Sequence, residues 1–351
     1  MQKKLIALAV AGLVSAPAFA QSNVTIYGVA DAYMAFGSQG DNDLSAVNSG
    51  GLAGSRIGFR GAEDLGNGLK AIFTYEHGVS IDANDGLGET LVPQQFVGLA
   101  GGFGSVTLGR LYAPGFDHVV DAFGNSGILS PQSILSGDLG LSIDAGSGSR
   151  WSNSVAYNGE FSGLKVRGIY SMNAKEAATG EQGTDVNDND AYGLGLNYAN
   201  GPLRVAAVYQ VIQADTADHK EWSVGGSYDF GVLTLAANYQ DAKSVNNIDD
   251  NDADIWQVGV IVPVGAAGKV HLGYGEADVD FAAADGKSKS YSIAYTHALS
   301  KRTTLYTGFN RTDNDNGLGL GVVGHQSGVN VGTGAAGDES DVFAVGVNHT
   351  F

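Results

Sequence analysis

Hydrophobic and polar residues alternate with a period of two along much of the chain. The end of the chain shows this most clearly: Phe343, Val345, Val347, His349 and Phe351 alternate with Val342, Ala344, Gly346, Asn348 and Thr350. Such alternation predicts a β-strand with one apolar face. Sixteen segments of this kind can be counted, at residues 24–35, 54–62, 69–77, 94–100, 104–111, 149–157, 164–172, 191–199, 203–212, 221–229, 232–241, 254–263, 269–277, 289–297, 303–311 and 342–351.

The lengths of these segments and of their connections favour a membrane barrel. Many segments have about nine to eleven residues, which is the length that a tilted strand needs to cross a bilayer. Short turns rich in Gly, Asn and Ser alternate with long acidic loops, which include residues 37–53, 78–93, 173–190, 242–253 and 312–340. This alternation is typical of an up-and-down barrel, and an even number of strands places both chain ends on the side of the short turns.

The polar faces of the predicted strands argue against a soluble β-sandwich. A sandwich exposes one face to bulk water, where Lys and Glu are common. Here the polar faces carry Thr, Ser, Asn, Gln and Gly with few Lys or Glu. A closed barrel inverts the arrangement, with lipid outside and water inside. It also gives every backbone N–H and C=O group in the wall a hydrogen-bond partner. Sixteen strands are enough to enclose an aqueous channel.

Composition and the first residues place the protein outside the cytoplasm. Lys3 and Lys4, an apolar run at 5–14 and an Ala18-Phe19-Ala20 site predict a signal peptide over 1–20, which leaves 21–351 as one barrel domain. No run of eighteen apolar residues follows. The chain has no cysteine, and its 37 acidic and 19 basic residues give a net charge of −18. This excludes disulfides, and it makes a nucleic-acid partner a poor fit.

The longest connection, residues 112–148, is the candidate functional segment. Long loops without secondary structure are uncommon in compact domains and are usually functional or disordered. This one is rich in apolar residues, which need burial: Phe116, Phe123, Ile128, Leu129, Ile134, Leu135, Leu139 and Ile143. We therefore expect it to fold inward as a constriction loop and to carry Asp117, Asp121 and Asp138 into the lumen. The predicted fold is all-β, a 16-stranded antiparallel up-and-down transmembrane β-barrel with an inward-folded constriction loop.

Arginines on the predicted wall are candidates for the other side of the constriction. Arg56, Arg60 and Arg150 fall on the polar parity of their strands, and an arginine facing lipid at mid-bilayer costs about 2–4 kcal/mol. Arg110 shares parity with Val106 and Leu108, so it points inward only if a bulge resets the strand near Gly109. Lys70, Lys165 and Arg167 also have the polar parity, nearer the short turns. Rings of charge at a constriction set ion selectivity.

Several runs of residues resemble the trimeric general porins of Gram-negative outer membranes, in their β-proteobacterial branch. The runs lie at 24–31, 55–61, 63–69, 97–99, 102–104, 108–110, 150–157 and 299–303, and the terminal Phe351 completes them. The resemblance covers essentially the whole chain. It implies a sixteen-stranded homotrimer that passes small hydrophilic solutes, with Arg56, Arg60, Arg110 and Arg150 facing an inward loop. The loop departs from some relatives at 113–117, which leaves open which loop acid faces the arginines.

We therefore expect a passive diffusion channel in the cell outer membrane, with no catalysis, cofactor or metal. Its expected partners are outer-membrane lipid and lipopolysaccharide, and small hydrophilic solutes and ions. The arginines at the constriction favour anions, whereas the acidic external loops attract cations. Charges at the constriction are screened less by salt than charges on the external loops, so we expect a weak anion preference. A substrate-specific channel and a surface adhesin are the alternatives.

Other motifs fit external loops. The run 319–324 matches G-x-G-x-x-G but lacks the strand–helix context of a dinucleotide site. Acidic runs at 185–190 and 249–254 lack the spacing of an EF-hand, so we interpret them as solvated loops, with divalent-cation binding as a hypothesis.

Overall fold

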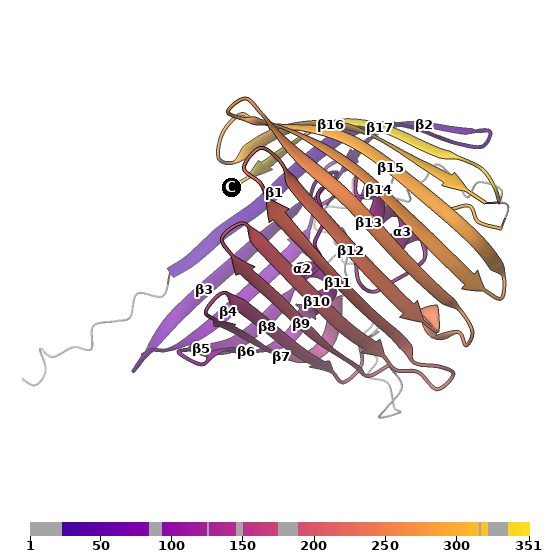
Figure 1. Ribbon diagram of the computed structural model, residues 1–351. Coiled ribbons are helices and arrows are strands. Elements are labelled where there is room, and N and C mark those ends of the chain that lie inside the picture. Colours follow the sequence, from indigo (N-terminus) through magenta and orange to yellow (C-terminus); the bar gives the residue numbers. More distant parts are fainter. Residues whose placement is uncertain are drawn as a thin grey trace, which may run out of the picture.

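The computed structural model describes residues 23–83, 93–124, 126–144, 150–174, 189–315, 317–321 and 336–351. The predicted signal peptide lies outside these residues. Seventeen strands in the described part form one antiparallel sheet that closes on itself, because β1 (Asn23–Gln39) pairs with both β3 (Arg56–Gly66) and β17 (Ser340–Thr350). Figure 1 shows the resulting barrel, with tilted strands around a lumen. Sixteen of these strands form the closed wall and the other one forms a hairpin with β1, so the predicted 16-stranded barrel is confirmed.

The remaining wall strands follow in chain order, and their bounds agree closely with the predicted segments. They are β4 (Leu69–Gly78), β5 (Gln95–Gly101), β6 (Gly104–Tyr112), β7 (Arg150–Phe161), β8 (Leu164–Ser171), β9 (Ala191–Asn200), β10 (Leu203–Ile212), β11 (His219–Asp229), β12 (Thr234–Lys243), β13 (Asp252–Val264), β14 (Gly268–Phe281), β15 (Ala284–Ala298) and β16 (Thr303–Asn314).

The strand β2 (Asn42–Ser49) was not expected, because it lies in a segment that the sequence indicates as a long loop. It forms a hairpin with the far half of β1, where Ala32 pairs with Ser49. The near half of β1 pairs with β3, which begins at Arg56 opposite Val29. The hairpin therefore covers the part of the β1 edge that β3 does not reach.

The two faces of the wall have the predicted alternation. On β17 the side chains of Phe343 and Val345 are more than 40% exposed, whereas Val342 and Ala344 are fully buried. Outward apolar side chains of this kind suit contact with lipid. Both described ends of the chain lie on the side of the short turns, since Phe351 hydrogen bonds to Gly28 near the start of β1.

The protein core lies in the lumen. Between β6 and β7 the chain forms α2 (Pro114–Asp117) and α3 (Pro131–Asp138), and Figure 1 places both helices within the barrel. Helix α2 contacts β6 and β8 to β10, and α3 contacts β13 to β15. Ser130 caps α3 by accepting from the Ser133 amide. The short helix η1 (Val245–Asn247) connects β12 to β13, and its Val245 is buried in a cluster with Leu135 of the inner loop. Neither described α-helix has the length and apolar character needed to cross a membrane.

Candidate functional site

The chain between β6 and β7, here called the inner loop, covers residues 113–144 apart from residue 125, which the structure does not describe. Its apolar residues have the burial that their composition demands: Ile128, Leu129, Leu135 and Ile143 are 0% exposed. These side chains belong to the clusters that pack between the loop and the wall. The loop therefore fills part of the lumen.

Glycines on the inner face of the wall make room for this packing. A Cβ on Gly259 of β13 would lie 2.5 Å from the Cβ of Ala122, and one on Gly308 of β16 would lie 2.6 Å from Leu129. The glycines with the same role are Gly193 and Gly195 against Pro114, and Gly273 and Gly275 against Phe123 and Pro131. Close packing of this kind leaves no space for larger side chains. The wall and the loop are thus matched in shape.

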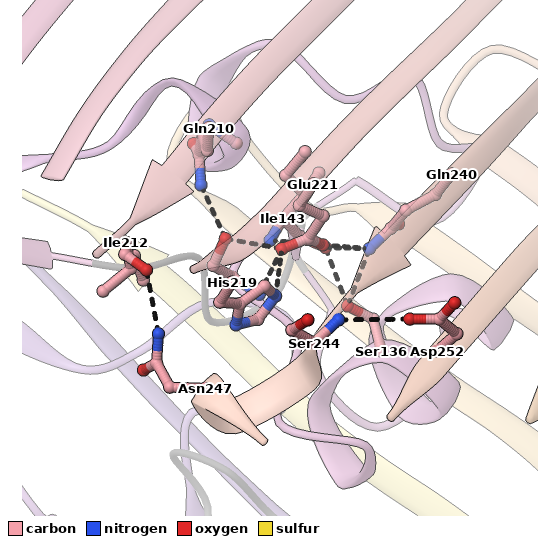
Figure 2. A network of polar contacts seen from close by, with 12 residues as sticks. Ser136, Ile143, Gln210, Ile212, His219, Glu221, Gln240, Ser244, Asn247 and Asp252 are labelled. Carbon is pink, nitrogen blue, oxygen red and sulfur yellow. Dashed lines mark hydrogen bonds and ion pairs between the residues drawn. The ribbon is translucent and has the colours of Figure 1, made fainter. Parts of the chain in front are cut away.

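A buried carboxylate holds the end of the inner loop to β11 (Figure 2). Glu221 is fully buried, and its oxygens accept hydrogen bonds from the amides of Ser142 at 2.8 Å and Ile143 at 3.0 Å. The Ser142 hydroxyl and Gln240 Nε2 donate to the same carboxylate at 2.5 and 2.6 Å. His219 Nε2 lies 3.3 Å from it. Each carboxylate oxygen is therefore satisfied without contact to lysine or arginine in the described part of the chain.

Amide side chains fasten the rest of the loop. At its start, the amide of Gly115 donates to Gln210 Oε1 at 2.6 Å. In the middle, the backbone amide of Gln132 donates to Gln257 Oε1 at 3.1 Å, and the side-chain Nε2 of Gln132 donates to Gln240 Oε1 at 2.9 Å. These wall residues lie on β10, β12 and β13. Buried polar groups with complete partners specify one arrangement, so the loop has a defined position.

Arg56 and Arg60 share the inner face of β3 and gather around Tyr27 of β1. Arg56 Nε lies 3.7 Å from Glu76 Oε1, and the Tyr27 hydroxyl donates to the same oxygen at 2.8 Å. The Arg60 guanidinium lies 4.8 Å from the centre of the Tyr27 ring, which is a cation–π contact. Phe59 between them is exposed on the outer face. The parity predicted for both arginines agrees with this geometry.

Arg150 begins β7 and stacks on aromatic rings at the base of the inner loop. Its guanidinium carbon lies 5.0 Å from the Tyr112 ring and 6.0 Å from the Phe116 ring. The two rings stack on each other at 4.1 Å with planes 9° apart. Arg150 is therefore held against the point where the chain leaves the wall.

Arg110 lies at an irregularity of β6. The register between β6 and β7 shifts between Gly109 and Leu111, and Gly109 has φ +143°, a conformation that favours glycine. A bulge thus lies where the parity argument requires one for Arg110 to turn inward. Its Nη1 donates to Ser152 Oγ at 2.9 Å.

Two of the three candidate loop acids contact other parts of the wall, and the third, Asp138, accepts from the amide of Gly321 at 2.9 Å. Asp117, at the end of α2, lies 3.7 Å from Arg167 of β8. Asp121 Oδ1 accepts from Gln257 Nε2 of β13 at 2.9 Å. Burial raises the pKa of Asp121 to about 6, and it lowers the pKa of His118 from its usual value.

A cavity of about 990 Å³ lies between α2 and the short turns. Lys165, Arg167 and Arg204 line it together with His118 and the acids Asp117 and Glu160. Arg204 was not among the residues predicted from the sequence, although parity could have found it. Its neighbours Leu203 and Val205 are exposed on the outer face, so Arg204 belongs to the inner one. The basic lining therefore continues past the inner loop toward the short turns.

Within the described ranges, no three His, Asp or Glu side chains converge in an arrangement that could hold a metal ion. This includes the acidic run at 249–254. Residues 185–188 of the other acidic run, and 322–324 of the glycine motif, lie outside the described residues.

Comparisons with known proteins agree on one family. A model of the Gram-negative porin family matches residues 7–317. Outer membrane porin protein 32 of Delftia acidovorans is 34% identical over 364 residues, which covers both chains in full. The structure of an anion-selective porin from Comamonas acidovorans has 30% identity and a TM-score of 0.78, and the match covers 94% of this chain and 100% of that one. In-vitro folded OmpT of Vibrio cholerae in its trimer form has a TM-score of 0.68 over 94% of this chain and 99% of that one, at 18% identity, which concerns the fold alone.

Proposed function

Because the chain belongs to the Gram-negative porin family, we propose that its barrel is a water-filled channel with a weak preference for anions. It is an outer-membrane protein, and its relatives are channel proteins rather than enzymes. Small hydrophilic solutes and ions are the proposed cargo. The similar porin from Comamonas acidovorans is described as anion-selective, which supports the same preference here.

The observation that carries the proposed preference is the division of the lumen. The inner loop is seated on β6, on β8 to β10 and on β13 to β15. Arg56 and Arg60 lie on β3, Arg110 lies on β6 and Arg150 lies on β7, along the wall from β3 to β7. Solutes that pass the loop would therefore travel beside these guanidinium groups, whose positive charge favours anions. Asp117 and Asp121 would form the acidic side of the constriction.

The test is a planar-bilayer recording of the refolded protein under a salt gradient. We expect stepwise conductance and a reversal potential with the sign of anion preference. A reversal potential of the opposite sign would refute the anion preference and leave the channel in place. A folded, heat-modifiable sample with no conductance would refute the open channel itself.

Two further expectations concern processing and assembly. We propose that residues 1–20 are removed on export, so that the mature chain begins at Gln21, which N-terminal sequencing of the purified protein would check. We also propose a homotrimer embedded in lipid and lipopolysaccharide, as the resemblance of the strand and turn sequences implies. Unheated electrophoresis should then give a band of three chains that heating converts to one, and a single-chain band without heating would refute the trimer.

A further inference from the structure

Asp31 of β1 is a buried carboxylate at the seam where the first and last strands meet. It is 0% exposed, and it forms no ion pair with any residue in the described part of the chain. Its Oδ1 accepts from the Tyr306 hydroxyl of β16 at 2.6 Å, and its Oδ2 accepts from Asn348 Nδ2 of β17 at 2.8 Å. One side chain thus joins three strands of the closed barrel.

The same carboxylate holds the chain that connects β2 to β3. The amides of Gly51, Leu52 and Ala53 donate to it at 3.0, 3.0 and 3.1 Å. Gly51 is confined at this position, because a Cβ there would lie 2.2 Å from the Tyr306 hydroxyl. Five donors therefore surround Asp31, and they satisfy its buried oxygens without a cation.

The middle of the inner loop rests on this held segment. Ser126 is fully buried, and its hydroxyl donates to the carbonyl oxygen of Gly51 at 2.8 Å. The amide of Leu129 donates back to the Ser126 hydroxyl at 3.2 Å. Ile128 and Leu129 belong to the same buried cluster as Tyr306, and Leu52 packs against that cluster. The path from Asp31 to the loop therefore runs through Gly51 and consists of hydrogen bonds and direct packing.

We propose that Asp31 is a positioning residue of the channel, which ties residues 126–129 of the inner loop to the closing seam of the barrel. Two of its five donors come from β16 and β17, so the arrangement that holds Gly51 is complete only when β1 has met the last strands. The loop then takes its final position as a consequence of barrel closure. This inference rests on the proposed channel function, because its readout is the current through the open pore.

The direct test is Asp31→Asn. One carboxylate oxygen becomes an amino group that faces donors instead of accepting from them, which leaves buried N–H groups without partners. We expect residues 126–129 to leave their site more often, by roughly fivefold if about one net hydrogen bond is lost. In single-channel recordings, this should appear as increased open-channel noise.

Asp341→Asn is the matched control. Asp341 lies on β17 at the same seam and pairs with Arg311 of β16 at 2.5 Å. It shares the outward parity of Phe343 and Val345, whereas the segment 51–53 and the inner loop lie on the inward side of the wall. We expect this variant to lower the temperature of heat modification while open-channel noise stays at the wild-type level. Equal noise in both variants would show that any loss at the seam disturbs the pore, and it would overturn the specific path through Gly51.

A double variant with Ser126→Ala separates positioning from general destabilisation. If Asp31 acts through Gly51 and Ser126, the noise caused by Asp31→Asn should not add to that caused by Ser126→Ala. Additive noise, or Asp31→Asn channels as quiet as the wild type, would overturn the proposal. If Asp31→Asn does not fold, Tyr306→Phe removes a single donor and should give the same effect, smaller in size. Failure of the wild type to conduct would count against the channel function and not against this path.

Discussion

Gly259 of β13 and Ala122 of the inner loop touch so closely that a Cβ on the glycine would lie 2.5 Å from the alanine Cβ. The alanine Cβ is fixed to its backbone, so a side chain at 259 could be accommodated only by moving the loop. On the neighbouring strand β14, His271 Nδ1 lies 2.8 Å from the carbonyl oxygen of Ala122. This pair of strands therefore fixes one point of the loop backbone by shape and by a polar contact.

Gly259→Val should displace the inner loop and change the size of the pore. Overpacking a buried site costs typically about 1–3 kcal/mol, which is comparable to the contacts that hold a single point of the loop. We expect a smaller unitary conductance in planar bilayers, because the loop would move away from β13 into the part of the lumen through which solutes pass. Gly168→Val is the control, because a Cβ on Gly168 has no neighbour within 4 Å. An unchanged conductance in a folded Gly259→Val barrel would show that the loop does not limit the current.

The inward fold of the loop could be predicted from its own residues, but its seat could not. Apolar side chains such as Leu129 and Ile143 require burial, and the lumen is the only interior that a barrel offers. The seat depends on glycines of the polar parity, such as Gly259 and Gly308, and a glycine in a strand can equally mark a bulge or a tight bend. Only the assembled barrel places these glycines opposite the loop.

Replacing Arg56, Arg60 and Arg150 with glutamine should shift selectivity toward cations. A unit charge about 6 Å from a passing ion contributes about 0.7 kcal/mol in water, with opposite sign for an anion and a cation. Each replacement should therefore change the ratio of anion to cation permeability about tenfold. The reversal potential under a salt gradient measures this ratio. Arg311→Gln is the control, because Arg311 shares the outward parity of Leu305 and Phe309 on β16 and is bound to Asp341 and Glu339. Equal shifts in the control and in the triple variant would mean that these three arginines do not line the narrow part.

Parity assigns a wall arginine to one face of the sheet only where the strand is regular. Arg56 and Arg60 are two such residues, four positions apart on β3. Arg110 could not be assigned from sequence, because the shift in register at Gly109 depends on how β6 meets β7. The acids were harder still. Asp117 lies near Arg167 because it ends α2, a helix of four residues. The position of α2 depends on its packing against β8 to β10. No local sequence signal encodes that contact.

The hairpin of β1 and β2 shows a similar limit. The sequence of residues 42–49 indicates part of a polar external loop, and isolated hairpins are marginally stable in water. The hairpin forms here because β17 already supports β1 on its other edge, from Val29 to Gln39. The sequence predicts the strands that alternate strongly, and it misses the one whose pairing depends on a distant partner.

Glu221→Gln should loosen the end of the inner loop. The amides of Ser142 and Ile143 donate to different oxygens of Glu221, so the new amino group removes the acceptor of one of them. Leaving a buried donor unpaired costs about 1–3 kcal/mol. We expect faster limited proteolysis within the inner loop and a lower temperature of heat modification. Glu160→Gln is the matched control, since Glu160 of β7 is exposed. Identical proteolysis rates in the two variants would show that the carboxylate of Glu221 does not hold the loop.

Asp121 should make selectivity depend on pH. Burial raises its pKa from 3.8 to about 6, so it loses its charge as pH falls through that value. A loop acid that becomes neutral stops attracting cations, and anion preference should therefore increase below about pH 6. The same shift affects stability, because the folded state binds the proton more tightly than the unfolded state does. The stabilisation is complete below the unfolded pKa of 3.8 and is lost as pH rises toward about 6. The free energy of unfolding then falls by at most about 1.4 kcal/mol per pH unit. Asp121→Asn keeps an oxygen to accept from Gln257 and cannot titrate. Reversal potentials recorded between about pH 7.5 and about pH 4.5, a window that spans the raised pKa, should show an inflection near 6 in the wild type and none in this variant. The same inflection in both would assign the titration to another group.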